Sequence, residues 1–279
     1  MYHPSIIVSI SKAQDVPKSA DHWNRKLRKV KGIKDELDFV GTFVLSILIW
    51  ITYIICKIKK NHIRSQYSNI RVMNEGNTIM KLYHAAASPY ARKTRVTLRE
   101  ANISELVEEV EVAPWTDPEG YRDITPLGKV PALERDDGHN LFQSSIICEY
   151  FASLNPAINL YPNEGEIRWK NLRLIGAGDG IMDASVGVRV ENLFHEEPTQ
   201  SHKFIQRQEV TVTKSLDLLE SNTDELEGPV SAGQIAVACA LAYRDFRFSE
   251  IKWRSDRPKL SQWFGSFCER ASMQDTDPE

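Results

Sequence analysis

KLYHAAASPYARKTRV, residues 81–96, contains the transition that decides the fold. Its first four residues are typical of a short strand, and three alanines then lead to Ser88 and Pro89. Serine is favoured immediately before a helix, and proline is favoured as the first helical residue. Apolar residues recur at helical spacing as far as Ala101. The stretch therefore predicts a strand, a tight turn and a helix that begins at Pro89 and ends before Asn102.

The residues that follow continue an alternation of strands and helices. Alternating apolar residues and a hairpin signal at 136–139 predict further strands, and a Pro- and Asp-rich stretch predicts a loop. The expected elements are a strand at 106–112, a loop at 114–125, strands at 130–134 and 140–142, and a helix at 144–154. This order predicts a compact α/β unit with a mixed sheet.

The remainder of the chain shows no strand signal and predicts helices only. In residues 231–248, apolar and small residues recur at helical spacing, which predicts a buried central helix. Ser231 and Gln234 have the spacing of a capping box at its start. We expect this helix to hold the domain together by packing. The predicted divisions are a basic extension at 1–79, an α/β domain at 80–157 and an all-helical domain at 163–279.

Charge divides the chain at the same point. Residues 1–79 carry 13 Lys and Arg against 6 Asp and Glu, whereas the remainder carries 22 against 32. The acidic body has neither a basic face nor an RNA-binding motif, so nucleic acid is not an expected partner. The four cysteines are widely spaced, which argues against a zinc site or a disulfide framework and favours buried free thiols in a reducing compartment. They are Cys56, Cys148, Cys239 and Cys268.

The extension contains an uncharged run at 39–56, followed by Lys57. A helix of 18 residues is about 27 Å long, close to the roughly 30 Å hydrocarbon core of a bilayer. Residues 39–58 are therefore a candidate single-pass transmembrane helix, and a buried soluble helix is the alternative. Met73 and Met80 could each be the true start, so residues 1–79 are expected to be either an optional anchor or a mistranslated leader.

Several segments, taken in order, carry a family resemblance. They are the Ser-Pro helix start, PLGKVPAL at 126–133, QSSIICEYF at 143–151, GDGIMDA at 178–184, GQIAVACALAYRDFRF at 233–248 and ERASMQDT at 269–276. Together they resemble the cytosolic-type, bacterial-like glutathione transferases over residues 80–278. The resemblance implies a thioredoxin-like α/β N-terminal domain followed by an all-α C-terminal domain.

The resemblance also implies a role for Ser88. The family places its thiol-activating residue near this position, where a hydroxyl and a helix amino terminus both favour the thiolate of glutathione. A purely structural helix cap is the alternative for Ser88.

Further residues gain glutathione-binding roles from the same resemblance. Pro131 is expected to follow a cis peptide bond, which would turn the backbone of Val130 toward the cysteinyl part of glutathione. Gln143 and Ser144 are expected to hold the γ-glutamyl group, and Lys129 is expected to pair with the glycyl carboxylate. Many family members have an acidic residue at the position of Gln143, so amine recognition here is expected to need another group, which a second subunit could supply.

A second-substrate pocket is expected between the two domains. Its candidate lining residues are Tyr90, Trp115, Trp169, Met182 and Phe194, and core or interface packing is the alternative for each. Asp179 and Asp183 lie four residues apart, and without a companion metal ligand they favour capping or a polar network within the helical domain.

The leading hypothesis is a glutathione S-transferase that conjugates glutathione, as co-substrate, to a small soft electrophile in detoxification. No metal is expected. One alternative is a glutathione-dependent thiol or dehydroascorbate reductase, which in this family usually has Cys in place of Ser88. Another is a non-catalytic, membrane-tethered glutathione-binding protein. The resemblance further implies a homodimer with a cytoplasmic catalytic body, membrane-anchored if residues 1–79 are retained.

Overall fold

The computed structural model describes residues 79–278, all within one compact unit. The candidate transmembrane helix at 39–58, the basic extension and Cys56 lie outside the described residues. Within residues 79–278, no helix is both long enough and apolar enough to cross a membrane.

The first part of the described chain alternates strands and helices, as the sequence predicts. Its elements are β1 (Met80–His84), α3 (Pro89–Glu100), η4 (Ser104–Leu106), β2 (Val107–Glu111), η5 (Pro114–Thr116), α4 (Tyr121–Ile124), β3 (Ala132–Glu134), β4 (Leu141–Phe142), α5 (Ser144–Leu154) and η6 (Pro156–Ile158). The region expected as a loop at 114–125 contains two short helical turns. The second of them follows Gly120, whose φ of 75° lets the chain reverse.

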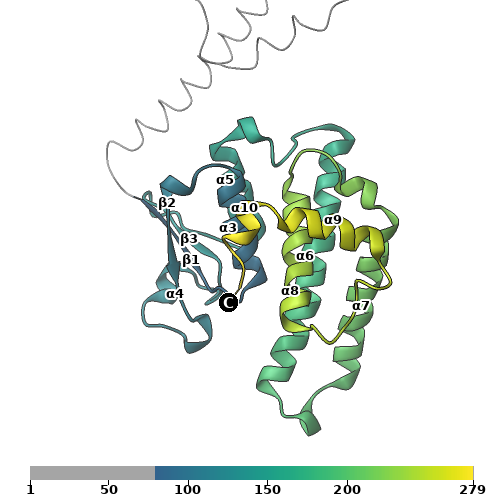
Figure 1. Ribbon diagram of the computed structural model, residues 1–279. Helices are drawn as coiled ribbons and strands as arrows, with labels where there is room; N and C mark the ends of the chain where they lie inside the picture. Colours follow the sequence, from purple (N-terminus) through teal and green to yellow (C-terminus); the bar gives the residue numbers. More distant parts are fainter. Residues whose placement is uncertain (1–78, 279) are drawn as a thin grey trace, which may run out of the picture. The chain divides into compact units, whose positions relative to one another are not determined.

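The strands form one mixed sheet in the order β2-β1-β3-β4. β1 pairs in parallel with β2, while β3 is antiparallel to both β1 and β4. The helices α3 and α5 cover one face of this sheet (Figure 1). Leu82, Leu133, Ile147 and Phe151 are fully buried in the core they form. Ile146 is 51% exposed, since it lies about 100° around the α5 axis from the fully buried Ile147.

The second part of the described chain is helical. Its elements are α6 (Gly165–Phe194), η7 (Glu197–Thr199), α7 (His202–Ser221), η8 (Thr223–Leu226), α8 (Ala232–Arg247), α9 (Pro258–Cys268) and α10 (Ala271–Gln274). The thioredoxin-like unit and the helical part together confirm the predicted fold class for the described residues.

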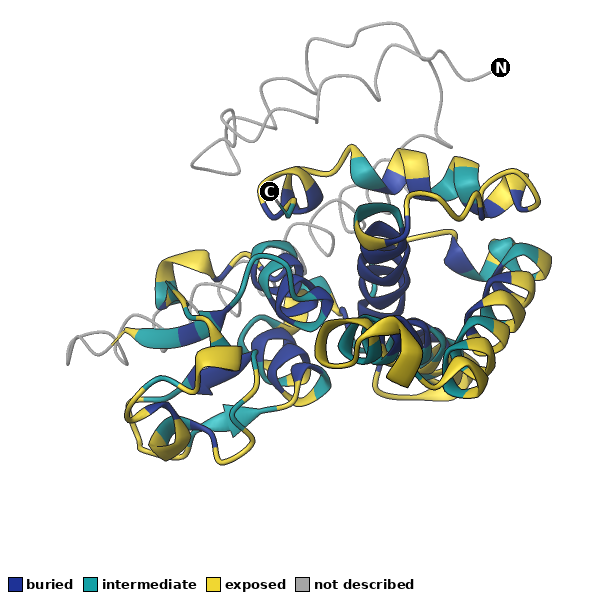
Figure 2. Cartoon of the chain, turned by 90° about the horizontal axis from the view of Figure 1, so that it is seen from below, coloured by how far each residue is buried: buried dark blue, intermediate teal, exposed yellow. Residues whose placement is uncertain are grey.

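Helix α8 is the centre of the helical part. Every residue from 232 to 244 is buried, and α3, α6 and α9 pack around it. Figure 2 shows buried residues along the inner faces of the helices and exposed residues on the outside. The capping box is confirmed, because the Ser231 hydroxyl accepts from the Gln234 N–H and the Gln234 side chain accepts from the Ser231 N–H. Packing of α3 on α8 joins the two parts.

Candidate active site

Ser88 lies where β1 leads into α3. Its backbone N–H donates to the Ala85 carbonyl at 2.9 Å, which closes the turn between strand and helix. Pro89 occupies the first helical position, and the Ser88 hydroxyl accepts from the Ala91 N–H at 3.3 Å. Ser88 is therefore the N-cap of α3, and only partly buried.

The cap leaves Ser88 able to stabilise an anion. A hydroxyl has one proton to donate and two lone pairs that accept, so accepting from Ala91 leaves its proton free. The first turn of α3 contains no acidic residue that would neutralise the positive end of the helix. An anionic sulfur or oxygen placed beside Ser88 would gain both a donated hydrogen bond and the field of the helix.

The sheet register brings Val130 and Pro131, the second predicted glutathione-binding group, to the end of the sheet where Ser88 lies. Tyr83 pairs with Ala132, so the antiparallel register sets His84 opposite Pro131 at the end of β1 that leads to Ser88. The Val130–Pro131 peptide bond is cis, which confirms that prediction. The backbone just before Pro131 is held by the Tyr121 hydroxyl, which donates to the Lys129 carbonyl at 3.0 Å. The Lys129 side chain is exposed.

The register between β3 and β4 brings Gln143 and Ser144, the third predicted glutathione-binding group, to the same end of the sheet. Ala132 pairs with Phe142, so the register places Gln143 opposite Pro131. Gln143 precedes α5 with φ 77° and ψ 121°, a conformation that costs free energy in a residue with a side chain. Ser144 is 5% exposed at the first position of α5. Ser88, Val130, Gln143 and Ser144 are thus brought to one end of the sheet, beside two helix amino termini.

Three aromatic candidates connect the two parts of the protein. The Tyr90 hydroxyl donates to Asp183 at 2.5 Å, and burial, followed by this hydrogen bond, raises the pKa of the Tyr90 phenol far above its usual value. Trp115 and Phe194 are both well exposed, and their ring centroids are 5.4 Å apart at an interplanar angle of 59°. This pair connects the loop before α4 with the end of α6.

The other two second-substrate candidates lie elsewhere. Met182 is fully buried in the hydrophobic core, so it offers no surface to a ligand. Trp169 is 63% exposed near the start of α6. It precedes Asp183 by 14 residues, which is about 21 Å along the helix axis at 1.5 Å per residue. The structure therefore does not place Met182 or Trp169 in a pocket beside Ser88.

Asp179 belongs to a polar network, as expected, but the network crosses between the two parts of the protein. Lys93, only 2% exposed, contacts Asp179 at 2.5 Å and the Ser145 hydroxyl at 3.0 Å. Ser145 in turn donates to the second Asp179 oxygen at 2.7 Å. The cluster connects α3, α5 and α6. Between residues 79 and 278, no group of three or more potential metal ligands is present.

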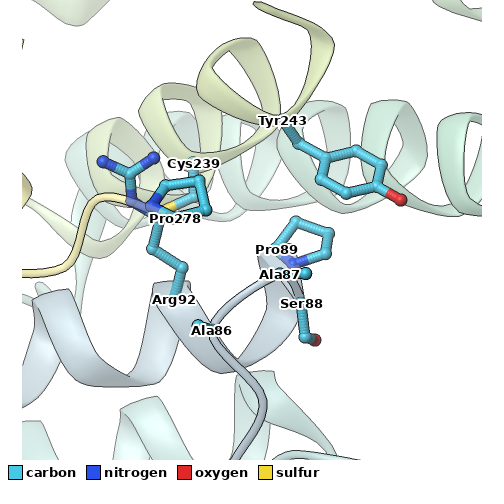
Figure 3. Close-up of a pocket in the computed structure, with 8 residues that line it drawn as sticks. All are labelled: Ala86, Ala87, Ser88, Pro89, Arg92, Cys239, Tyr243 and Pro278. Carbon is cyan, nitrogen blue, oxygen red and sulfur yellow. The ribbon is translucent and has the colours of Figure 1, made fainter. Parts of the chain in front are cut away.

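A small pocket borders the loop at Ser88 on its α8 side, and its volume of about 10 Å³ has room for roughly one water molecule. It is lined by Ala86, Ala87, Ser88, Pro89, Arg92, Cys239, Tyr243 and Pro278. In Figure 3 the Ser88 hydroxyl points away from Pro278 and Tyr243, so an atom bound to that hydroxyl would lie outside this pocket. Sequence reasoning assigned α8 to packing alone and missed Tyr243, Arg92 and Pro278. No spacing in the sequence links these three positions to Ser88.

The described cysteines are free thiols. Cys148 and Cys239 are buried, as expected, whereas Cys268 is only partly buried because it lies at the end of α9. Burial raises the pKa of Cys148 to about 11 and that of Cys239 to about 12. Cys239 is therefore a neutral thiol at physiological pH, although it borders the pocket.

Comparison with known proteins agrees with this arrangement. Residues 87–154 match the family model for the glutathione S-transferase N-terminal domain, and residues 203–266 match that for the C-terminal domain. The chain is 33% identical over 207 residues to the uncharacterized GST-like protein YibF of Escherichia coli K12. That alignment covers 71% of this chain and 98% of YibF.

Solved structures show the same relationship. A glutathione transferase family member from Pseudomonas fluorescens Pf-5 with bound glutathione is 35% identical and superimposes with a TM-score of 0.69, covering 72% of this chain and 99% of that chain. A structure from the same organism with bound S-(propanoic acid)-glutathione is also 35% identical, with a TM-score of 0.66 over 72% of this chain and all of that chain. From the extent of these matches, the chain belongs to the glutathione S-transferase family.

Proposed function

We propose that the protein is a glutathione transferase in which Ser88 activates the thiol of glutathione for attack on a small soft electrophile. The observation that carries the proposal is the Ser88 hydroxyl, which caps α3 as an acceptor and keeps its own proton to donate. A free thiol has a pKa of about 8.5 and is mostly protonated at neutral pH. A hydrogen bond donated to sulfur and the positive end of α3 both favour the thiolate.

The groups at the end of the sheet suit the remaining parts of glutathione. In this proposal, the Val130 backbone pairs with the cysteinyl backbone as an added strand does. Ser144 and the amino terminus of α5 receive the γ-glutamyl carboxylate, since helix amino termini bind anions. The Gln143 amide oxygen accepts from the γ-glutamyl amine, and the exposed Lys129 pairs with the glycyl carboxylate. The glutathione bound in the Pseudomonas fluorescens relative supports glutathione as the ligand.

The chemical step is a displacement or an addition at carbon. The thiolate donates an electron pair to the electrophilic carbon and forms a carbon–sulfur bond. With an activated halide, the carbon–halogen bond breaks and halide leaves with its electron pair. With an α,β-unsaturated substrate, the electron pair moves to the activating group, and solvent then supplies a proton. The protein contributes position and electrostatic stabilisation, without a covalent intermediate of its own.

The relative with bound S-(propanoic acid)-glutathione carries a small substituent on sulfur, which supports an electrophile of few atoms.

The state of Cys239 favours conjugation over thiol–disulfide exchange. Exchange requires a protein thiolate, and burial raises the pKa of Cys239, the cysteine that borders the pocket, to about 12. In the reductase alternative, the position of Ser88 usually holds a cysteine. We therefore propose a transferase rather than a reductase.

We also propose that the protein acts as a homodimer in the cytoplasm. Several large apolar side chains are exposed on the described surface and would be stabilised by a second copy; they include Ile146, Ile167 and Trp169. Size-exclusion chromatography with light scattering tests the assembly, and a monomer at micromolar concentration would contradict it.

The test of catalysis compares two helix caps. The Ser201 hydroxyl accepts from the Phe204 N–H at 3.3 Å, the same capping distance that Ser88 makes to Ala91. Replacing either serine by alanine is expected to cost about 1 kcal/mol of stability through the lost cap. Only Ser88→Ala is expected to lower kcat/KM with chlorodinitrobenzene, by about 10- to 150-fold, since a hydrogen bond to a charged group contributes about 1.5–3 kcal/mol.

Three results separate the hypotheses. Glutathione binding without turnover of any electrophile would replace the transferase by a binding protein. Full activity of Ser88→Ala would remove Ser88 from the mechanism while leaving the transferase. Glutathione-dependent reduction of dehydroascorbate at a rate above conjugation would favour the reductase.

A further inference from the structure

Two tyrosines pack together on the face of the sheet that points away from α3. Leu82 of β1 is fully buried in the core shared with α3 and α5. Successive side chains of a strand point to opposite faces, so Tyr83 points to the other face. There it meets Tyr121, the first residue of α4, which lies against β3 (Figure 1). The two ring centroids are 5.7 Å apart, and Tyr121 is only 3% exposed, so its ring is held against the sheet.

The Tyr121 hydroxyl fixes the direction of one peptide group. It donates to the Lys129 carbonyl at 3.0 Å. That carbonyl belongs to the same planar peptide group as the N–H of Val130, and because this peptide bond is trans, the carbonyl and the N–H point in opposite directions. Holding the carbonyl on the Tyr121 side therefore directs the Val130 N–H to the opposite side.

Val130 lies just beyond the end of the ladder between β1 and β3. The last pair of that ladder is Tyr83 with Ala132. Neither the N–H nor the carbonyl of Val130 has a hydrogen-bond partner among the described residues, and Val130 is only partly buried. Backbone groups in this position are the ones that an added, extended peptide pairs with. The peptide group that Tyr121 orients is therefore available to an extended ligand.

The turn that leads to this peptide group is held separately. The Gly128 N–H donates to the Thr125 carbonyl at 3.1 Å, and Thr125 is fully buried. Within residues 79–278, the Tyr121 hydroxyl is then the only group that hydrogen-bonds the Lys129–Val130 peptide. Removing this hydroxyl would free the peptide without undoing the turn.

We propose that Tyr121 is a positioning residue for glutathione binding, which acts by orienting the Lys129–Val130 peptide toward the cysteinyl backbone of glutathione. The inference rests on the proposed function, because it assumes that this backbone pairs with Val130. The hydrogen bonds then form a chain, from the Tyr121 hydroxyl to the Lys129 carbonyl and from the Val130 N–H to the cysteinyl carbonyl. Hydrogen bonds in such a chain polarise and strengthen one another. Tyr121 itself does not contact glutathione.

Tyr121→Phe removes the hydroxyl and keeps the ring that packs on Tyr83. The Lys129 carbonyl then loses its donor and finds another by turning toward water, which moves the Val130 N–H away from the direction that suits the ligand. The dissociation constant of glutathione is expected to rise about 3- to 10-fold, the effect of one hydrogen bond. KM for glutathione is expected to rise by a similar factor. The value of kcat at saturating glutathione is expected to stay at the wild-type level, because Ser88 is unchanged.

Tyr83→Phe is the matched control. The Tyr83 hydroxyl donates to Glu134 at 2.8 Å, and burial is the largest cause that raises the pKa of both phenols to about 12. Losing either hydroxyl is therefore expected to lower stability by a comparable amount. The Tyr83 hydroxyl does not bond the Lys129–Val130 peptide, so Tyr83→Phe is expected to keep wild-type affinity for glutathione. A general loosening of the sheet would instead weaken binding in both variants.

S-methylglutathione separates this role from that of Ser88. It keeps the peptide backbone of glutathione but has no thiol to ionise. Tyr121→Phe is expected to weaken the binding of both ligands by the same factor, since its effect is on the backbone. Ser88→Ala is expected to weaken the binding of glutathione more than that of S-methylglutathione.

The experiment titrates the full chain and its variants with both ligands by calorimetry, and measures stability by urea unfolding. Affinity is measured without turnover, so a protein that binds glutathione but does not react still tests the inference. Wild-type affinity of Tyr121→Phe for both ligands would overturn the inference and leave the proposed function in place, and so would an equal loss of affinity in Tyr83→Phe. A wild-type protein that binds neither ligand would overturn both.

Discussion

Gly178 marks the closest approach of α6 and α8, and we expect alanine there to be destabilising. A Cβ at this position would lie 2.5 Å from the carbonyl carbon of Ala236, 2.7 Å from its oxygen and 2.8 Å from the nitrogen of Val237. Ordinary contacts of a Cβ begin at 3.4 Å, and all three neighbours are backbone atoms. They cannot move aside as a side chain can, so the two central helices must separate by the better part of an ångström.

The magnitude follows from two opposing effects. Overpacking a close-packed interior costs about 1–3 kcal/mol, and a clash with backbone belongs at the upper end. Replacing glycine by alanine within a helix stabilises it by up to about 1 kcal/mol. The net loss for Gly178→Ala is therefore about 2 kcal/mol, which lowers Tm by about 4–8 °C in a protein of this size.

The same helix provides the control. Gly176 is exposed, and a Cβ there would have no atom within 4 Å. Gly176→Ala is therefore expected to stabilise the protein by about 0.4–1 kcal/mol. Urea unfolding of both full-length variants, at one protein concentration, measures the two free energies of unfolding. A Gly178→Ala protein as stable as wild type, or a shift of both variants in the same direction, would refute the reasoning.

Two further predictions concern buried and half-buried charges. Asp179→Ala leaves the buried Lys93 without its carboxylate and is expected to lower the free energy of unfolding by about 3 kcal/mol. The double variant Lys93→Met, Asp179→Leu is expected to recover most of that loss. A loss of less than about 1 kcal/mol for the single variant, measured by urea unfolding, would contradict this expectation. Burial raises the pKa of Glu100, but the hydrogen bonds from Arg270 and Ser272 outweigh burial and hold it below the usual 4.5. Because the folded pKa is the lower one, the stabilisation is present above about pH 4.5 and is lost as the pH falls further. The urea midpoint of wild type should then drop more steeply below that pH than the midpoint of Glu100→Gln, and parallel curves would show that Glu100 does not contribute.

Local signals predicted where the elements begin and end. Ser88 and Pro89 start α3, and Ser231 with Gln234 starts α8, because each cap is made between residues three positions apart. Hydrophobic alternation likewise located the strands to within one or two residues. The three predicted glutathione-binding segments meet at one sheet end because short connections leave the antiparallel register little choice.

Contacts between residues far apart in the sequence decided how the elements pack around the site. Tyr90 and Asp183 are 93 residues apart and Arg92 and Met273 are 181 apart, and no periodicity relates such positions. The local sequence does not show whether an apolar residue of a helix is buried in the core, as Met182 is, or exposed, as Trp169 is.

The sequence by itself therefore determined the elements, their caps and the position of Ser88 before a helix. Only the tertiary structure decided what lies beside that serine: α8 and Pro278, which are far from it in the sequence. The reason is physical, since a helix cap depends on the nearest few residues, whereas the walls of a pocket depend on how whole elements pack.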